Sequence, residues 1–308
     1  MPVLQNRKRF RDVLSFKKAD DRLPVIEWAA WWDATVNRWK TEGLPQDIEY
    51  SELNEYFGLD RLVQFWLSPS TSPEDCIEKI KESLYELKEL HDKGEIIVWI
   101  TLEGFFWYPR SLLGIEEHFY TFYDDPELMH RLNRKLTEFN IQVIEEFCKI
   151  IIPDFMTFAE DMSYNKGPMI SYELFKDFLL PYYKQVVPVL KKYNIITIID
   201  TDGNVEEMIP WLIEAGIEGV LPLERQAGVE VERIRRNYPN FLMIGGYDKM
   251  VMNKGEAEMR KEFERLMPVM KSGGFIPSCD HQTPPGVSLE NYRIYLRLLN
   301  EYCEKAIK

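Results

Sequence analysis

The sequence predicts an α/β fold, a (β/α)8 TIM barrel with an N-terminal helical extension, and two observations lead to this fold class. Eight short apolar runs recur along the chain with helical patterns between them, which is typical of parallel strands buried on both faces. Most of these runs end on a charged or reactive side chain, and a barrel builds its active site at the C-terminal ends of its strands. The runs cover residues 23–28, 61–66, 95–104, 154–161, 195–203, 219–224, 242–248 and 274–281.

The helices follow from start and stop signals in the sequence. A first helix over 5–19 forms the extension. Ser72 before Pro73, and Asp125 before Pro126, are typical helix starts, because Ser or Asp caps the first turn and proline fits the first helical position. The further helices are expected over 72–91, 125–150, 171–193, 204–215, 229–237, 255–272 and 288–306.

Size and composition favour a single globular domain over residues 1–308. Hydrophobic residues make up 45% of the chain, and no apolar stretch approaches the roughly 18 residues that a membrane helix needs. The basic N-terminus lacks an apolar signal core, so a cytoplasmic protein is expected. A net charge of −13 argues against a nucleic-acid or anionic membrane partner, since both require clustered Lys and Arg.

Acidic residues and a histidine at the strand exits are the candidate catalytic groups. The turn Asp200-Thr-Asp202-Gly203-Asn204 has a structural interpretation, with Asn204 as helix cap, but that does not explain two acids so close together. Asp248 could likewise cap the next helix, and Glu224 could pair with a neighbouring base. The candidates are Glu160, Asp161, Asp202, Asp248 and His281.

Acids that converge at one barrel mouth raise one another's pKa, so such a site holds a proton, a metal or a cationic substrate. Zinc accepts Cys, His and carboxylate ligands, and Asp202, Cys279 and His281 could supply three of them. Aromatic residues in the loops after the first and third runs favour an apolar lining for a substrate. The candidate substrate-binding residues are Trp28, Trp31, Trp32, Phe106, Trp107, Glu224 and Tyr247.

The segments 198–249 and 273–292, which contain IIDTDGN, PLERQAG, IGGYDK and PSCDH, resemble the uroporphyrinogen decarboxylase superfamily. The resemblance covers nearly the whole chain and implies a barrel fold. Decarboxylases of the family carry an arginine-rich RQAGR-type segment after the first strand that holds propionate groups. Here that region, 26–39, has Arg38 as its only arginine, and RQAG at 225–228 follows the sixth strand instead. Porphyrinogen decarboxylation is therefore not expected.

The methyl-transferring branch of this superfamily carries His-x-Cys-Gly after the fifth strand and a further Cys after the eighth. This sequence has Asp200-x-Asp202-Gly203 at the first place and Cys279 at the second. One ligand type is retained and two are replaced by oxygen donors, which does not suit activation of a thiol substrate. The sequence therefore looks like the branch that moves a methyl group from a methoxylated aromatic, an ether or an amine to a corrinoid protein, with zinc as a candidate metal and a homodimer as a candidate assembly. The alternatives are a decarboxylase of another carboxylate substrate and a non-catalytic barrel that binds a small molecule or a corrinoid.

Overall fold

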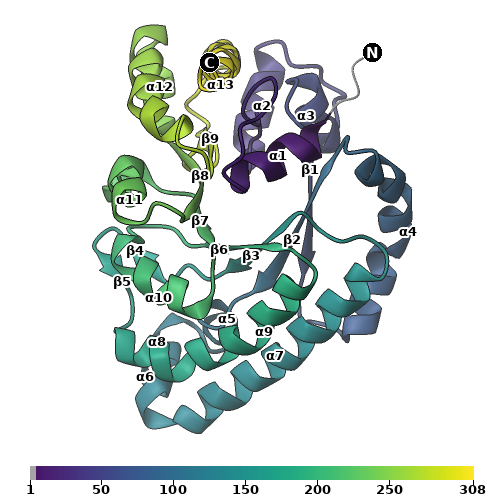
Figure 1. Cartoon of the computed structure of the whole chain (residues 1–308), viewed down its shortest axis with the longest axis vertical. Helices are drawn as coiled ribbons and strands as arrows, with labels where there is room; N and C mark the ends of the chain where they lie inside the picture. The colour runs from purple at the N-terminus through teal and green to yellow at the C-terminus, as the bar shows by residue number, and fades with distance from the viewer. Residues whose placement is uncertain (1–4) are drawn as a thin grey trace. The chain divides into compact units, whose positions relative to one another are not determined.

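The computed structural model describes residues 5–308, and in this range seven strands form one sheet in the order β1-β2-β3-β6-β7-β8-β9 (Figure 1). The strands are β1 (Leu62–Leu67), β2 (Ile97–Glu103), β3 (Phe155–Ala159), β6 (Ile196–Asp200), β7 (Gly219–Leu221), β8 (Leu242–Tyr247) and β9 (Phe275–Cys279). The pairs β2–β3, β3–β6 and β8–β9 are parallel. A short antiparallel pair, β4 (Ser163–Tyr164) and β5 (Gly167–Pro168), stands apart. Parallel strands taken in chain order, with helices between them, confirm the TIM-barrel-like α/β fold.

Helices separate most of the strands, as the sequence predicts. They are α1 (Asn6–Leu14), α2 (Asp33–Thr41), η1 (Tyr50–Glu52), α3 (Leu53–Tyr56), α4 (Pro73–Asp92), α5 (Trp107–Leu113), α6 (Ile115–Asp124), α7 (Pro126–Cys148), α8 (Tyr172–Phe178), α9 (Leu180–Lys192), η2 (Glu206–Met208), α10 (Ile209–Ala215), η3 (Arg225–Ala227), α11 (Val231–Asn237), η4 (Lys249–Lys254), α12 (Glu256–Met270) and α13 (Leu289–Lys305). The first helix ends earlier than expected, because the backbone of Phe16 turns into the left-handed region with a φ of 57°.

Both helix starts read from the sequence are confirmed. The hydroxyl of Ser72 accepts a hydrogen bond from the Asp75 N–H at 3.1 Å, and Oδ1 of Asp125 accepts one from the Leu128 N–H at 3.0 Å. Each cap satisfies an N–H group that the first helical turn leaves without an intrahelical partner.

The expected first strand, 23–28, is not a strand, so the prediction of eight strands is wrong by one. Asp60 explains the difference. Its N–H donates to the Val25 carbonyl at 2.8 Å, and its Oδ2 accepts from the Val25 N–H at 3.1 Å. Arg9 and Arg22 form ion pairs with the same carboxylate. A side chain therefore takes the hydrogen bond that a strand ladder would otherwise make with this extended segment.

The chain divides into two compact units of interleaved sequence. The first unit comprises Met1–Leu62, Gly94–Ile97 and Leu221–Lys308, and the second comprises Val63–Lys93 and Val98–Val220. The expectation of one domain over 1–308 stays a prediction.

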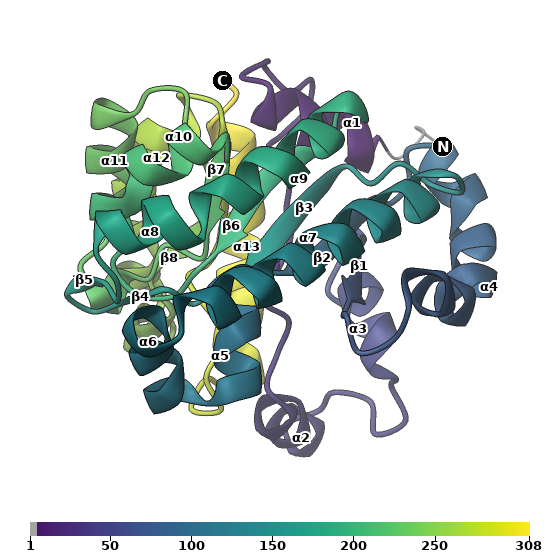
Figure 2. The same cartoon turned by 90° about the horizontal axis from the view of Figure 1, so that it is seen from below.

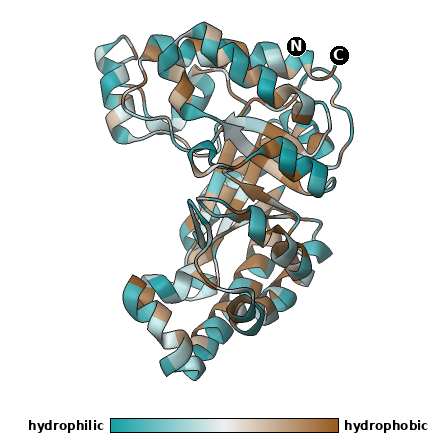
Figure 3. Cartoon of the chain, turned by 90° about the vertical axis from the view of Figure 1, so that its left-hand side faces the viewer, coloured by the Kyte–Doolittle hydropathy of each residue, from teal (hydrophilic) through white to brown (hydrophobic). Residues whose placement is uncertain are grey.

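Each unit buries its own core. In the first, the ring of Trp39 stacks on Tyr292, with centroids 4.5 Å apart. In the second, every residue of β3 and of β2 from Val98 onward is buried. Figure 3 shows that the strands are largely brown, which is the hydrophobic end of its scale. Helices α7 and α9 of the second unit lie side by side (Figure 2). No helix within residues 5–308 is long and apolar enough to cross a bilayer.

Candidate functional site

Three aspartates gather in the second unit where β3 and β6 end. Asp200 is the last residue of β6, and its carbonyl accepts the N–H of Asp161 at 3.3 Å. The Asp202 N–H in turn lies 3.5 Å from Oδ1 of Asp161. Asp161 turns the chain at this point with a φ of 42°, a backbone conformation that is uncommon for residues other than glycine. The structure therefore brings together Asp161 and Asp202, both predicted from the sequence, with Asp200.

Asp200 differs from an ordinary aspartate in the pKa of its carboxyl group. Burial raises its pKa well above the usual aspartate range, and the negative charges of Asp161 and Asp202 raise it further. Asp200 therefore keeps its proton at a pH where an ordinary aspartate has lost it. The sequence prediction did not include Asp200, although its position two residues before Asp202, at a strand exit, was the available signal.

One arginine faces the aspartate cluster. Nη2 of Arg110 lies 3.7 Å from the Asp161 carboxylate, and Nη1 donates to the Asp161 carbonyl at 3.0 Å. The guanidinium also lies over the ring of Trp107, 4.4 Å from its centroid. Arg110 thus places a positive charge beside the acids and fixes a partly exposed aromatic ring next to them. Its position in the aromatic loop after β2 gave no sign of this role.

Glu160, the neighbouring candidate, turns into the interior. Its carboxylate accepts the N–H groups of Phe105 at 2.7 Å, Phe106 at 2.8 Å and Trp107 at 3.0 Å, and the hydroxyl of Tyr183. Burial raises the pKa of Glu160 to about 7, although these four donors lower it. Only 1% of the residue is exposed, so this carboxylate holds the start of α5 in place and does not face solvent.

A second polar cluster lies in the first unit, in the loops after β7, β8 and β9. Asp280 is buried and accepts the N–H of Arg225 at 2.9 Å and that of Lys249 at 3.1 Å. Nζ of Lys249 lies 3.3 Å from Asp280 and 3.5 Å from Glu224. Burial alone would lower the pKa of Lys249, but the two carboxylates outweigh it and raise that pKa. Neither Lys249 nor Asp280 was among the residues predicted from the sequence.

His281 lies beside this cluster, between two tryptophans. Its ring stacks against Trp32 with centroids 6.5 Å apart, and Trp28 approaches it edge-on at 6.3 Å. An imidazole nitrogen of His281 and a carboxylate oxygen of Glu224 lie within 4.8 Å of each other. This spacing suits two ligands of one metal ion, and nitrogen with carboxylate oxygen is a donor set that zinc accepts.

Cys279 differs from its expected arrangement. Side chains two residues apart on a strand point the same way, but β9 ends at Cys279, so His281 lies beyond the strand. The thiol is fully buried, and burial, followed by the charges of Glu27 and Asp280, raises its pKa well above the usual range. The thiolate form that binds zinc is therefore disfavoured. Glu224 is the residue that the structure brings close to His281.

The remaining candidates separate into packed and exposed groups. Asp248 caps η4, because its Oδ1 accepts the Met250 N–H at 2.8 Å, and the same atom accepts from the Gln226 amide at 2.7 Å. Three predicted substrate-binding aromatics, Trp31, Phe106 and Tyr247, are at most 3% exposed and pack among other rings. Those that keep exposed ring surface are Trp28, Trp32 and Trp107.

Fold and geometry together define a TIM-barrel-like α/β protein with polar groups concentrated at the C-terminal ends of its strands. A family model described as uroporphyrinogen decarboxylase (URO-D) matches residues 69–302, which is more than half of the chain. The chain therefore belongs to the uroporphyrinogen decarboxylase family.

Solved structures with the same fold include a methyltransferase from Methanosarcina mazei, with 15% identity over 97% of this chain and 99% of that one and a TM-score of 0.69. A putative vitamin-B12 independent methionine synthase from Listeria monocytogenes has 11% identity over 92% of this chain and 96% of that one, with a TM-score of 0.49. At 15% identity the likeness to the first structure shows a shared fold and nothing more. The second likeness is too weak to support any conclusion. No curated protein matches the sequence.

Proposed function

We propose that the chain is a methyltransferase that moves a methyl group from a small methylated substrate, a methoxylated aromatic, an ether or an amine, to a corrinoid protein. Membership of the uroporphyrinogen decarboxylase family supports this proposal. So does the methyltransferase from Methanosarcina mazei, which shares the fold over nearly the full length of both chains.

The observation that carries the proposal is the gathering of Asp161, Asp200 and Asp202 where β3 and β6 end, with Arg110 beside them. Burial, followed by the neighbouring charges, raises the pKa of Asp200 and favours its protonated form. When a methyl group leaves an ether or an amine, the carbon–heteroatom bond breaks and its electron pair stays on the oxygen or nitrogen. The departing heteroatom is a poor leaving group unless it receives a proton as the bond breaks. Asp200 would donate that proton and become a carboxylate, and the guanidinium of Arg110 stands next to the cluster to offset the added negative charge.

The other candidate residues would bind the substrate or hold the site's loops in position. Trp28, Trp32 and Trp107 keep exposed ring surface on which an aromatic or aliphatic substrate can pack. Glu160 would act as a positioning residue, because it holds the backbone from Phe105 to Trp107 and thereby the Trp107 ring. Asp248 would position the loop after β8 in the same way through its cap.

The donor set of Glu224 and His281 fits a zinc ion. Both residues lie in the first unit and would hold the ion there. The further ligand Asp202, expected from the sequence, stays a prediction. Zinc, when bound, supplies a Lewis acid that polarises the leaving heteroatom. A corrinoid on the partner protein would supply the nucleophile for the methyl group.

A methyl-transfer assay with free cob(I)alamin and a panel of methoxylated aromatics, ethers and methylamines tests the function. The expected result is a donor-dependent change in the cobalamin absorption spectrum, together with release of the demethylated product. The matched control is Asp177→Asn, an exposed change elsewhere in the second unit, which should transfer at the wild-type rate. A protein that methylates cobalamin with no donor of the panel, but releases CO2 from a carboxylate substrate, would be a decarboxylase instead.

A further inference from the structure

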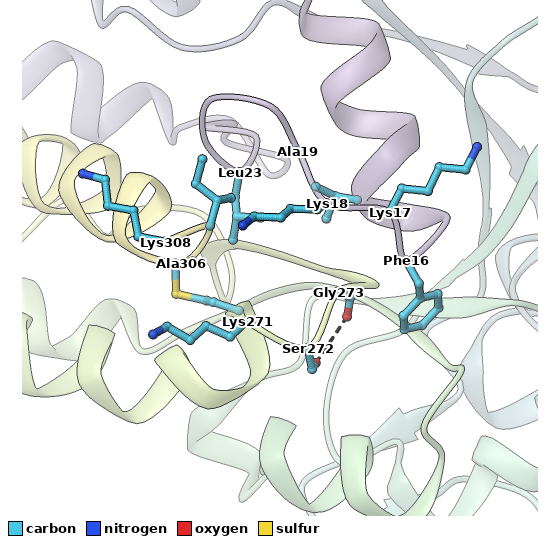
Figure 4. Close-up of a pocket in the computed structure, with 13 residues that line it drawn as sticks. Phe16, Lys17, Lys18, Ala19, Leu23, Lys271, Ser272, Gly273, Ala306 and Lys308 are labelled. Carbon is cyan, nitrogen blue, oxygen red and sulfur yellow. Dashed lines mark hydrogen bonds between the residues drawn. The ribbon is translucent and has the colours of Figure 1, made fainter.

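A pocket of about 360 Å³ lies in the first unit, where the helices α1, α12 and α13 end (Figure 4). It is formed by the end of α1 and the loop that follows, by residues 270–273 after α12, and by residues 306–308 after α13. The proposed function uses none of these residues.

The pocket and the His281 cluster lie at opposite ends of β9. Ser272 and Gly273 line the pocket and precede the strand, whereas Cys279 ends it and His281 follows. A five-residue strand spans about 16 Å, at roughly 3.3 Å per residue. A ligand in the pocket would therefore not touch the candidate site in this unit.

The lining combines apolar walls with lysines. Val13, Leu23, Met270 and Ala306 are buried and supply apolar surface. The lysines of the lining are Lys17, Lys18, Lys271 and Lys308. In Figure 4, Lys18 extends along the pocket beside Leu23, whereas Lys17 points away from it.

The negative ends of the three helices do not neutralise the positive charge of the pocket lysines. The C-terminus of a helix carries about half a negative charge, which favours a nearby lysine. Three helix ends therefore contribute roughly −1.5 charges, whereas Lys18 and Lys271 alone contribute two positive ones. Positive charge remains in excess at the pocket, although the whole chain has a net charge of −13.

Three acids on neighbouring segments are already paired with other bases. Asp20 binds Lys8 at 2.9 Å, and Asp21 binds Arg9. Glu301 of α13 binds Arg260 at 2.9 Å and also contacts Lys305. Within residues 5–308, none of the four pocket lysines forms an ion pair with a carboxylate. The excess charge is therefore available to a ligand.

One wall of the pocket is preformed. The ring of Phe16 lies so close to Gly274 that a Cβ there would come within 2.3 Å of the ring. Arg235 covers the same ring at 5.1 Å from its centroid and donates to the Gly273 carbonyl at 2.9 Å. A wall fixed in this way needs little reorganisation when a ligand enters.

We propose that this pocket binds a small organic phosphate, with the apolar part of the ligand on Leu23, Met270 and Ala306 and the phosphate among Lys18, Lys271 and Lys308. Ammonium groups form charge-assisted hydrogen bonds with phosphate oxygens, and the apolar walls add selectivity for an organic ester over inorganic phosphate. This inference is independent of the proposed methyl transfer.

Isothermal titration calorimetry of the full chain with phenyl phosphate tests the proposal, with inorganic phosphate and phenol as comparison ligands. Phenyl phosphate is expected to bind at one site per chain, more tightly than inorganic phosphate, and phenol is expected not to bind. The double variant Lys18→Gln, Lys271→Gln should weaken phenyl phosphate binding by about a hundredfold, at about tenfold per charged hydrogen bond.

The matched control is Lys176→Gln, Lys184→Gln, which removes the same charge from exposed positions of the second unit and should leave the affinity unchanged. Equal weakening in both double variants would show attraction to overall charge and overturn the proposal. Absence of saturable binding to the wild-type chain would overturn it as well, as would phenol binding as tightly as phenyl phosphate.

Discussion

A Cβ atom on Gly104 would lie 2.0 Å from Cδ of Glu160, so the buried carboxyl group fills the space that any other residue at 104 would need. Glu160 follows β3 and Gly104 follows β2, and these strands are neighbours in the sheet. The absence of a side chain at 104 lets the carboxylate reach the three N–H groups at the start of α5.

Gly104→Ala should therefore destabilise the fold markedly. The new methyl group would push the carboxylate away from its four donors, and leaving buried donors unsatisfied costs about 1–3 kcal/mol for each group. We expect the free energy of unfolding to fall by about 3 kcal/mol or more in urea titrations. Gly286→Ala is the control, because its nearest neighbour would lie at an ordinary 3.4 Å. Equal losses for the two variants would contradict this packing argument.

Glu27 should make the stability depend on pH. Burial raises its pKa to about 7, against an ordinary value of 4.5, although Tyr295 donates to it at 2.6 Å. A raised carboxyl pKa stabilises the folded state below about pH 4.5, and this contribution is lost as the pH rises through about 7.

Glu27→Gln cannot ionise, so its free energy of unfolding should fall less than that of the wild type between these pH values. The difference should reach about 3 kcal/mol, since one pKa unit corresponds to about 1.4 kcal/mol. Urea unfolding at a series of pH values measures it, with the exposed Glu86→Gln as control. Parallel pH curves for Glu27→Gln and the wild type would rule this role out.

Asp200→Asn should slow methyl transfer while leaving the fold and substrate binding intact. Loss of a general acid costs about 10²- to 10⁴-fold in rate. The loss should be largest for donors with the most basic leaving groups, since these depend most on protonation. If Asp200 is the proton donor, wild-type activity should fall as the pH rises through its raised pKa, and Asp200→Asn should lack this limb. An unchanged rate on every donor would exclude Asp200 as the acid.

The variant Asp202→Asn distinguishes the role of Asp202 from that of Asp200. If Asp202 serves only to raise the pKa of Asp200, its replacement should shift the falling limb of the pH profile to lower pH and lower the rate less than Asp200→Asn does. A loss as large as that of Asp200→Asn would make Asp202 the proton donor or an essential metal ligand.

Zinc content should depend on Glu224 and His281. Elemental analysis after reconstitution with zinc is expected to show about one ion per chain for the wild type and a loss for Glu224→Gln and for His281→Ala. Cys279→Ala should retain the ion, because that thiol is fully buried and its pKa is raised. If Cys279→Ala loses zinc and Glu224→Gln keeps it, the ligand set predicted from the sequence, Asp202, Cys279 and His281, is the correct one.

Uroporphyrinogen should not be decarboxylated at an ordinary enzymatic rate of about 1 per second or more. The only arginine of segment 26–39, Arg38, is partly exposed, forms an ion pair with Glu42 at 2.6 Å and donates to the Pro285 carbonyl at 3.0 Å. It is therefore already engaged on the protein surface and cannot replace a cluster of arginines for four carboxylates. Chromatography of the porphyrin products checks this, and turnover at that rate would overturn the argument.

Sequence reasoning located most elements because apolar periodicity and caps are local signals. Ser72 and Asp125 mark helix starts through contacts made within three residues. Segment 23–28 has the composition of a strand, but its conformation is decided by Asp60, about 35 positions away in the sequence. Composition cannot report such a distant partner, and for this reason the first strand was predicted wrongly.

The candidate site, too, depends on partners that are distant in the sequence. The acids at the strand exits were found from their positions, but which of them is protonated depends on burial and on neighbours in space. Glu160 and Asp161 are adjacent in the sequence, yet one turns into the interior and the other pairs with Arg110. Burial raises the pKa of Asp200, and charges at two different strand exits raise it further. The burial and the contacts of these acids follow from the three-dimensional structure and not from their positions in the sequence.

The carboxylate of Asp280 has a consequence for how this protein can change during evolution. Loops on a barrel can usually be exchanged one at a time, which is how one scaffold acquires many activities. Here a single buried side chain after β9 anchors the backbone of Arg225 after β7 and of Lys249 after β8. An insertion in any one of these three loops would disturb the other two, so new substrate specificity should arise here through coordinated replacement of all three.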